Sequence, residues 1–212
     1  MGKIRTVLFD WDGTLFDSTM ANFAVYEDIF RHFGLPPISF QEFQDEFTAD
    51  YYAYYEKKGI PKSRHREVDE VWYASFTKRQ KGIPLTSGAA ETVRGITEKG
   101  ISLGIVSNSM SARIHEEMHA HGIHAHFKTI VSFAEVPELK PSPASIKHAL
   151  SLLKAAPAET LYVGDMAEDV MAGKRAGCVT AAISGGMHSR ERLAREKPDH
   201  LLEEVRQILG II

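Results

Sequence analysis

The residues of this chain that could do chemistry begin with two aspartates separated by one residue. Asp10 and Asp12 follow an apolar run at residues 5–9, and Gly13 and Thr14 come directly after them. Alternate residues of a strand point to the same side, so both carboxylates can face one site. Carboxylates this close repel each other unless a cation neutralises them or one holds a proton. The pair predicts a nucleophile and a proton donor at an anion-accepting turn, although acids at such a turn can also simply cap a helix.

Two further polar segments are typical of anion binding. Ser107 and Asn108 follow a second apolar run, where a hydroxyl and a helix N-terminus could bind an anion or merely cap the helix. Lys140 precedes Pro141 and a predicted helix, so its ammonium could pair with a phosphate oxygen or stay solvated.

Two more aspartates complete the set of candidate residues. Asp165 follows the apolar run 161–163, and Asp169 comes four residues later, one helical turn away on the same face. Carboxylates at a strand end that face Asp10 and Asp12 suit Mg²⁺, which prefers oxygen ligands. An acidic first helical turn would explain them without a metal. We expect Glu168 to face solvent.

Five apolar runs must position these residues. They are continuous rather than alternating, as in strands that are buried on both faces of a parallel sheet. Helical patterns separate most of them, which predicts an α/β fold with a doubly wound parallel sheet and polar residues at its carboxyl edge. The strands are expected at residues 5–9, 101–106, 129–133, 161–163 and 179–183, and the helices at 89–99, 111–120, 143–154, 168–176 and 199–209.

The stretch between the first strand and residue 89 lacks a convincing strand and holds most of the chain's aromatic residues. Breaks at Gly34, Gly59 and Gly82, each followed by proline within three residues, separate expected helices at 18–33, 40–57 and 64–80. We therefore expect a catalytic core at residues 1–15 and 86–212 and an inserted α-helical cap domain at residues 16–85. Connections near residues 15–17 and 84–87 would let the cap move.

The composition and charge of the chain argue against nucleic acid and membranes as binding partners. The 212 residues carry 25 Lys and Arg against 28 Asp and Glu, a formal net charge of −3 that gives no footprint for nucleic acid or an anionic membrane. No apolar run is long enough to span a membrane, no secretory signal is visible, and the single cysteine rules out an intramolecular disulfide. We expect a cytoplasmic protein.

Histidines crowd the stretch from His115 to His126. His115 and His119 have a zinc-compatible spacing, but no Glu-x-x-His context marks a site, and we expect a solvated surface. In the insert, Tyr51 and Tyr54 could line a substrate cavity or pack among aromatic residues, and Arg64 could meet an anionic substrate or only be solvated.

Taken together, four motifs resemble the haloacid dehalogenase superfamily of hydrolases, in its phosphoglycolate phosphatase-like and β-phosphoglucomutase-like subgroup. The motifs are DWDGTLFDS at 10–18, IVSNS at 105–109, LKPSP at 139–143 and VGDMAEDVMAGKRAG at 163–177. The resemblance implies a five-stranded Rossmann-like core in the order 5-4-1-2-3, with a helical cap. Trp11 is bulkier than the residue usual at its position, and we interpret it as a packing residue.

The resemblance also implies a role for each motif residue. Asp10 would be the nucleophile that forms an aspartyl-phosphate, and Asp12 the general acid/base. Mg²⁺ would be held by Asp10, Asp165 and the backbone carbonyl of Asp12, while Asp169 would support the metal site or steady Lys140. The phosphoryl group would be bound by Ser107, Asn108 and Lys140, with backbone help from Gly13 and Thr14.

These residues predict a Mg²⁺-dependent phosphatase that acts on a small-molecule phosphate monoester, as phosphoglycolate phosphatases do. The acid pair favours phosphoryl transfer over halide displacement, which needs no proton donor. A phosphomutase of the β-phosphoglucomutase type and a non-catalytic phospho-ligand sensor remain as alternatives. A monomer or weak homodimer is expected.

Overall fold

The computed structural model describes residues 3–212; residues 1 and 2 of the expected core lie outside the described part. At its centre, the four buried residues of β1 (Thr6–Phe9) form a strand between two parallel neighbours. Within residues 3–212 the sheet has six strands in the order β3-β2-β1-β4-β5-β6, and every pairing is parallel. The expected order 5-4-1-2-3 is confirmed for the first five. The other strands are β2 (Ser102–Val106), β3 (Thr129–Val131), β4 (Thr160–Gly164), β5 (Val179–Ile183) and β6 (His200–Leu202).

The sixth strand corrects the helix expected at residues 199–209. Asp199 accepts hydrogen bonds from the backbone N–H and the hydroxyl of Thr180, both at 2.8 Å. These bonds fix the chain beside β5, where Ala181 pairs with His200. Only the remainder is helical, as the 3-10 helix η4 (Val205–Gly210). A side-chain bond to a neighbouring strand therefore outweighs the local helical pattern.

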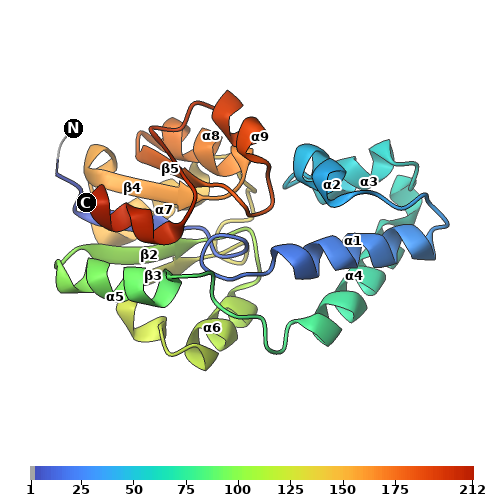
Figure 1. Ribbon diagram of the computed structural model, residues 1–212, viewed down its shortest axis with the longest axis horizontal. Helices are drawn as coiled ribbons and strands as arrows, with labels where there is room; N and C mark the ends of the chain where they lie inside the picture. Colours follow the sequence, from blue (N-terminus) through green and yellow to red (C-terminus); the bar gives the residue numbers. More distant parts are fainter. Residues whose placement is uncertain (1–2) are drawn as a thin grey trace.

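Helices cover both faces of the sheet, as the doubly wound prediction requires (Figure 1). Leu8 of β1 belongs to the cluster formed with α7 (Ala144–Leu153) and α8 (Ala167–Ala176). Val7 and Phe9 point the other way and belong to the cluster formed with α5 (Ala89–Glu98), α6 (Ser111–Ala120) and η4. The short helix α9 (Arg190–Arg195), which the sequence did not predict, packs through Leu193 against Val170 of α8. Two 3-10 turns, η2 (His124–His126) and η3 (Pro157–Glu159), complete this part of the chain.

The helices between β1 and α5 stand to one side of the sheet (Figure 1). They are α1 (Thr19–His32), α2 (Phe40–Glu46), α3 (Tyr51–Lys57), the 3-10 turn η1 (Lys62–Arg64) and α4 (His65–Arg79). The single helix expected at 40–57 is wrong. Asp50 starts a new helix there by accepting a hydrogen bond from the Ala53 N–H at 3.1 Å.

Two chain segments connect these helices to the sheet, and they lie side by side. The Asp17 N–H donates to the Pro84 carbonyl at 3.0 Å, and the Thr86 N–H donates to the Leu15 carbonyl at 2.9 Å. The assignment of residues 16–85 to a separate domain stays a prediction. Across residues 3–212, no helix has the length and apolar character needed to cross a membrane.

Candidate active site

Three buried carboxylates meet at the carboxyl edge of the sheet. Asp10 follows β1, Asp165 follows the adjacent β4, and Asp169 lies in the first turn of α8. One oxygen atom from each lies within 4.8 Å of the others, and none of the three residues is more than 4% exposed. The geometry brings Asp165 and Asp169 close to Asp10, as the sequence predicts, but Asp12, which was expected to face the same site, is not part of this group.

Lys140 lies inside this acidic group. Its Nζ is 2.8 Å from Asp10 Oδ1 and 2.6 Å from Asp169 Oδ1, and it also donates to the Tyr162 hydroxyl at 3.2 Å. Burial alone would lower the pKa of Lys140, but the carboxylates of Asp10 and Asp169 raise that pKa well above its usual value. Lys140 is thus a permanent cation between the two acids. The hydroxyl of Tyr162 on β4 also donates to Asp169 at 3.1 Å. Tyr162 was not singled out from the sequence because it lies within an apolar strand, where a tyrosine usually packs in the core.

One ammonium group does not balance three carboxylates. Burial and the nearby Asp169 raise the pKa of Asp10 to about 7 despite Lys140. Burial and the charges of Asp10 and Asp169 raise the pKa of Asp165 well above its ordinary value. A bound Mg²⁺ ion would offset this surplus of negative charge, and it prefers oxygen ligands such as these carboxylates. The residues therefore fit the expected metal.

Asp165 is held in a close-fitting cradle. Its Oδ1 accepts a hydrogen bond from the Thr14 hydroxyl at 2.8 Å, and its Oδ2 accepts one from the Met187 N–H at 2.7 Å. Gly13 has a φ of +73°, and a Cβ added at Gly13 or at Gly186 would overlap the Asp165 carboxylate. Both positions therefore require glycine for Asp165 to keep its place.

The Asp12 carboxylate is directed elsewhere, away from this group of three. It accepts hydrogen bonds from Ser18 Oγ at 2.7 Å and Ser109 Oγ at 2.6 Å, and it forms an ion pair with both terminal nitrogens of Arg113. Burial raises the pKa of Asp12, but Arg113 and the two hydroxyls outweigh burial and hold that pKa below its ordinary value. Asp12 is therefore a carboxylate in this arrangement.

Sequence reasoning missed Arg113, although a signal was present. Arg113 and Glu117 lie one turn apart on α6 and share a face of the helix, and Ser109 lies two residues before the helix begins. Arg113 Nη1 is 3.0 Å from Glu117 Oε1, and Glu117 Oε2 accepts the Trp11 indole N–H at 2.6 Å. Burial raises the pKa of Glu117 to about 7 against the opposing effect of Arg113.

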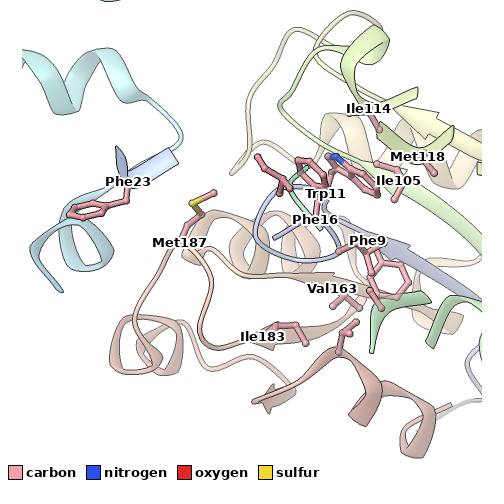
Figure 2. Close-up of a cluster of buried hydrophobic side chains, with 14 of the residues drawn as sticks. Phe9, Trp11, Phe16, Phe23, Ile105, Ile114, Met118, Val163, Ile183 and Met187 are labelled. Atoms are coloured by element: carbon pink, nitrogen blue, oxygen red, sulfur yellow. The ribbon is translucent and has the colours of Figure 1, made fainter. Parts of the chain in front are cut away.

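Trp11 points into the core, as the packing interpretation expects. Its ring stacks on Phe16 with centroids 5.4 Å apart, and Figure 2 shows both beside Ile105, Ile114 and Met118. The Trp11–Glu117 bond therefore crosses from the loop after β1 to α6.

The expected phosphate-binding residues surround the group, but several of their polar atoms have partners within the protein. Ser107 Oγ accepts from the Ser109 N–H at 3.2 Å, and Asn108 Oδ1 accepts from the Lys140 N–H at 3.1 Å. The Gly13 N–H donates to the Phe16 carbonyl at 2.8 Å and the Thr14 N–H to the Trp11 carbonyl at 3.3 Å. Their expected roles toward phosphate stay predictions.

The three candidate specificity residues make their contacts within the helical segment. Tyr54 is 2% exposed and stacks on Phe30, with ring centroids 6.3 Å apart. Tyr51 lies against Tyr52, with centroids 4.4 Å apart. Arg64 pairs with Glu67 and lies over a phenylalanine ring. Their expected effect on substrate choice stays a prediction.

The helical segment touches the edge of the site through α2 and the residues after it. Gln44 Nε2 donates to the Gly186 carbonyl at 2.9 Å, one residue before Met187. His188 is fully buried; its Nδ1 accepts from the Ala167 N–H and its Nε2 lies 2.9 Å from the Phe47 carbonyl. The expectation that Glu168 faces solvent is wrong. Glu168 is 7% exposed because it lies at this contact, where it accepts from the Ala49 N–H at 3.3 Å.

Comparisons with known proteins agree with this geometry. The sequence profile described as haloacid dehalogenase-like hydrolase matches residues 7–183. Pyrophosphatase PpaX of Oceanobacillus iheyensis is 30% identical and that of Listeria innocua is 31% identical, with at least 99% of this chain and 97% of each relative covered. A crystal structure described as a predicted phosphoglycolate phosphatase of Haemophilus somnus shares the fold, with a TM-score of 0.80, 22% identity and coverage of 100% of this chain and 99% of that one.

Proposed function

We infer, because the chain belongs to the haloacid dehalogenase-like hydrolase family, that this hydrolase is a Mg²⁺-dependent phosphatase that acts through an aspartyl-phosphate. The observation that carries this proposal is the Lys140 ammonium held between Asp10 and Asp169 inside a buried acidic group. Such a site attracts a metal cation and an anionic phosphoryl group together. We propose a small-molecule phosphate substrate, a monomer or weak homodimer, and the cytoplasm as the compartment.

We assign the metal to Asp10, Asp165 and the backbone carbonyl of Asp12, with Asp169 retained beside Lys140. When bound, Mg²⁺ offsets the charge of the attacking carboxylate and of the transferring phosphoryl oxygens. Thr14 and the Met187 N–H keep Asp165 oriented for this role.

The chain's own residues perform the two chemical steps. Asp10 attacks phosphorus, and Lys140, always protonated, stays paired with the oxygens that gain negative charge. Ser107 and Asn108 help to bind the phosphoryl group. With a monoester, Asp12 would first have to take up a proton before it could donate one to the leaving oxygen. As a carboxylate it accepts the proton of the water that cleaves the aspartyl-phosphate. Arg113 positions Asp12 for the second of these tasks.

We propose that the helical segment 16–85 is a cap over this site. The paired connections at Phe16 and Leu85 form a narrow joint between it and the sheet. On the far side, α2 meets the Gly186–Ser189 segment next to the Asp165 cradle. Closure at this contact would exclude water and place cap side chains, among them Tyr51, Tyr54 or Arg64, toward the leaving group.

A second candidate substrate is inorganic pyrophosphate. The Asp12–Arg113 ion pair keeps Asp12 ionised, and an ionised Asp12 cannot protonate a leaving group. An alkoxide needs that proton, whereas phosphate leaves readily as an anion. The relatives named pyrophosphatase, which match nearly the whole chain, point to the same substrate.

The deciding experiment measures kcat/KM for pyrophosphate, p-nitrophenyl phosphate and phosphoglycolate with and without Mg²⁺. Asp10→Asn is the inactive reference, and Glu98→Gln, an equally conservative change at an exposed residue of α5, is the matched control. Preference for pyrophosphate would select the second candidate, and preference for a monoester the first. No turnover of these compounds or of a broad panel of phosphate esters would favour the phospho-ligand sensor over both.

A further inference from the structure

Three imidazoles converge on the outer side of α6, away from the acidic group. His115 and His119 lie one helical turn apart on α6, and His124 belongs to η2. One ring nitrogen from each lies within 4.8 Å of the others. His115 Nδ1 is 2.8 Å from His124 Nε2, and the His119 ring stacks on that of His124 with centroids 4.0 Å apart.

The other two histidines of this stretch have separate partners. His121 Nε2 lies 3.0 Å from the Ile83 carbonyl, and His126 Nδ1 lies 3.1 Å from the Thr97 hydroxyl. Only three of the five histidines in this stretch, His115, His119 and His124, therefore bring their rings together. Among residues 3–212, no carboxylate lies within 4.0 Å of these three imidazoles to form an ion pair.

The His124 imidazole favours its neutral form. Burial, followed by the charges of His119 and His115, lowers the pKa of His124. The neutral imidazole is the form that binds metal. Ring nitrogens brought this close repel one another through their lone pairs unless a proton or a cation lies between them.

We propose that His115, His119 and His124 bind one transition-metal ion of the Zn²⁺ class, with solvent as a fourth ligand. Three imidazoles with an open position are a common Zn²⁺ set, and imidazole also suits Ni²⁺ and Cu²⁺. Zn–N bonds of about 2.0–2.1 Å place tetrahedral nitrogens roughly 3.3 Å apart, which small rotations of these rings can reach. Mg²⁺ prefers oxygen, so it would select the acidic group instead. The ion would cross-link α6 to η2.

The site is tested by titrating Zn²⁺ into the full chain with excess Mg²⁺ present, by calorimetry. Wild-type protein should bind one Zn²⁺ that His119→Ala and His124→Ala each weaken at least tenfold. His148→Ala removes an exposed histidine on α7 and is the matched control, with no expected change. Circular dichroism of the metal-free variants verifies that each is folded.

Co²⁺ identifies the ligands independently of affinity, because a tetrahedral nitrogen site absorbs visible light far more strongly than an octahedral oxygen site. The strong absorption should appear in wild type and in Asp165→Ala, which alters only the acidic group, and should be lost in His119→Ala. Equal Zn²⁺ binding by all the histidine variants, or absorption that is lost in Asp165→Ala instead, would overturn the proposal. Neither readout depends on turnover, so the result stands apart from the proposed phosphatase.

Discussion

Replacing Arg113 with methionine tests whether this residue governs Asp12. Arg113 is 16% exposed in its side chain, Asp12 17% and Glu117 10%, so the cation lies between two largely buried carboxylates. Removing one partner of a buried ion pair costs about 3–5 kcal/mol, because the other charge stays buried and unpaired. Glu117 has a pKa of about 7 and can take up a proton, so most of the loss falls on Asp12.

We therefore expect Arg113→Met to lower the free energy of unfolding by about 3 kcal/mol. In the double variant Asp12→Asn/Arg113→Met neither charge remains, and the cost should fall below the sum of the single changes by at least ~1 kcal/mol. Urea unfolding at pH 7 measures all four proteins. Arg94→Met, at a half-exposed arginine on α5, is the control and should change stability by less than about 0.5 kcal/mol.

Activity gives a second readout that a purely structural role would not move. An Asp12 without its positioning partner should lower kcat by about 10²-fold while KM changes little, since general acid–base catalysis contributes about that much. The reasoning is refuted if Arg113→Met loses less than about 1 kcal/mol, if the double variant is additive, or if kcat is unchanged in folded protein.

Four further outcomes are expected. Asp10→Asn should abolish turnover and keep the fold, because the amide has the same shape but cannot attack; activity near wild type would contradict the nucleophile. Chelator should abolish activity and Asp165→Ala should raise the Mg²⁺ requirement or abolish turnover, whereas full activity in excess chelator would exclude the metal. Burial lowers the pKa of His188 to about 3 from an ordinary 6.5, so between these pH values the unfolded chain binds one proton more than the folded chain. The free energy of unfolding should therefore fall by up to about 1.4 kcal/mol for each pH unit from 6.5 down to 3. His188→Gln should lose this pH dependence, as measured by urea unfolding at several pH values. Inorganic phosphate should appear at the rate at which substrate disappears, without a sugar bisphosphate activator; rapid isomerisation with little phosphate release would favour the mutase.

The buried strands of the fold could be predicted because their apolar runs report burial on both faces. Element ends and the last strand could not, because long-range bonds decide them. β6 depends on Asp199 reaching Thr180, and the break at Phe47 depends on the Phe47 carbonyl meeting His188 on the other side of the contact. Neither partner is visible in a local pattern.

The acidic group could be predicted because Asp10 and Asp165 each follow a strand, the ends of parallel strands meet, and Asp169 lies one helical turn beyond Asp165. The partners of Asp12 were missed, since a lone arginine in a helix is usually solvated. Glu168 was misjudged for a similar reason: helical position alone says nothing about a second layer of chain packed above it.

The bulk of Trp11 and the charge state of Asp12 are linked through one chain of contacts. A buried indole N–H needs an acceptor, and Glu117 provides it at 2.6 Å. A largely buried glutamate needs a cation or a proton, and Arg113 provides the cation. Arg113 then pairs with Asp12, the next residue along the chain from Trp11, and its Cζ also lies 5.0 Å from the Phe76 ring centroid on α4. Trp11 thus helps to keep Asp12 ionised, through Glu117 and Arg113. Helix α4 lies against the same Arg113 guanidinium. Through Phe76, a movement of the helical segment would reach this guanidinium.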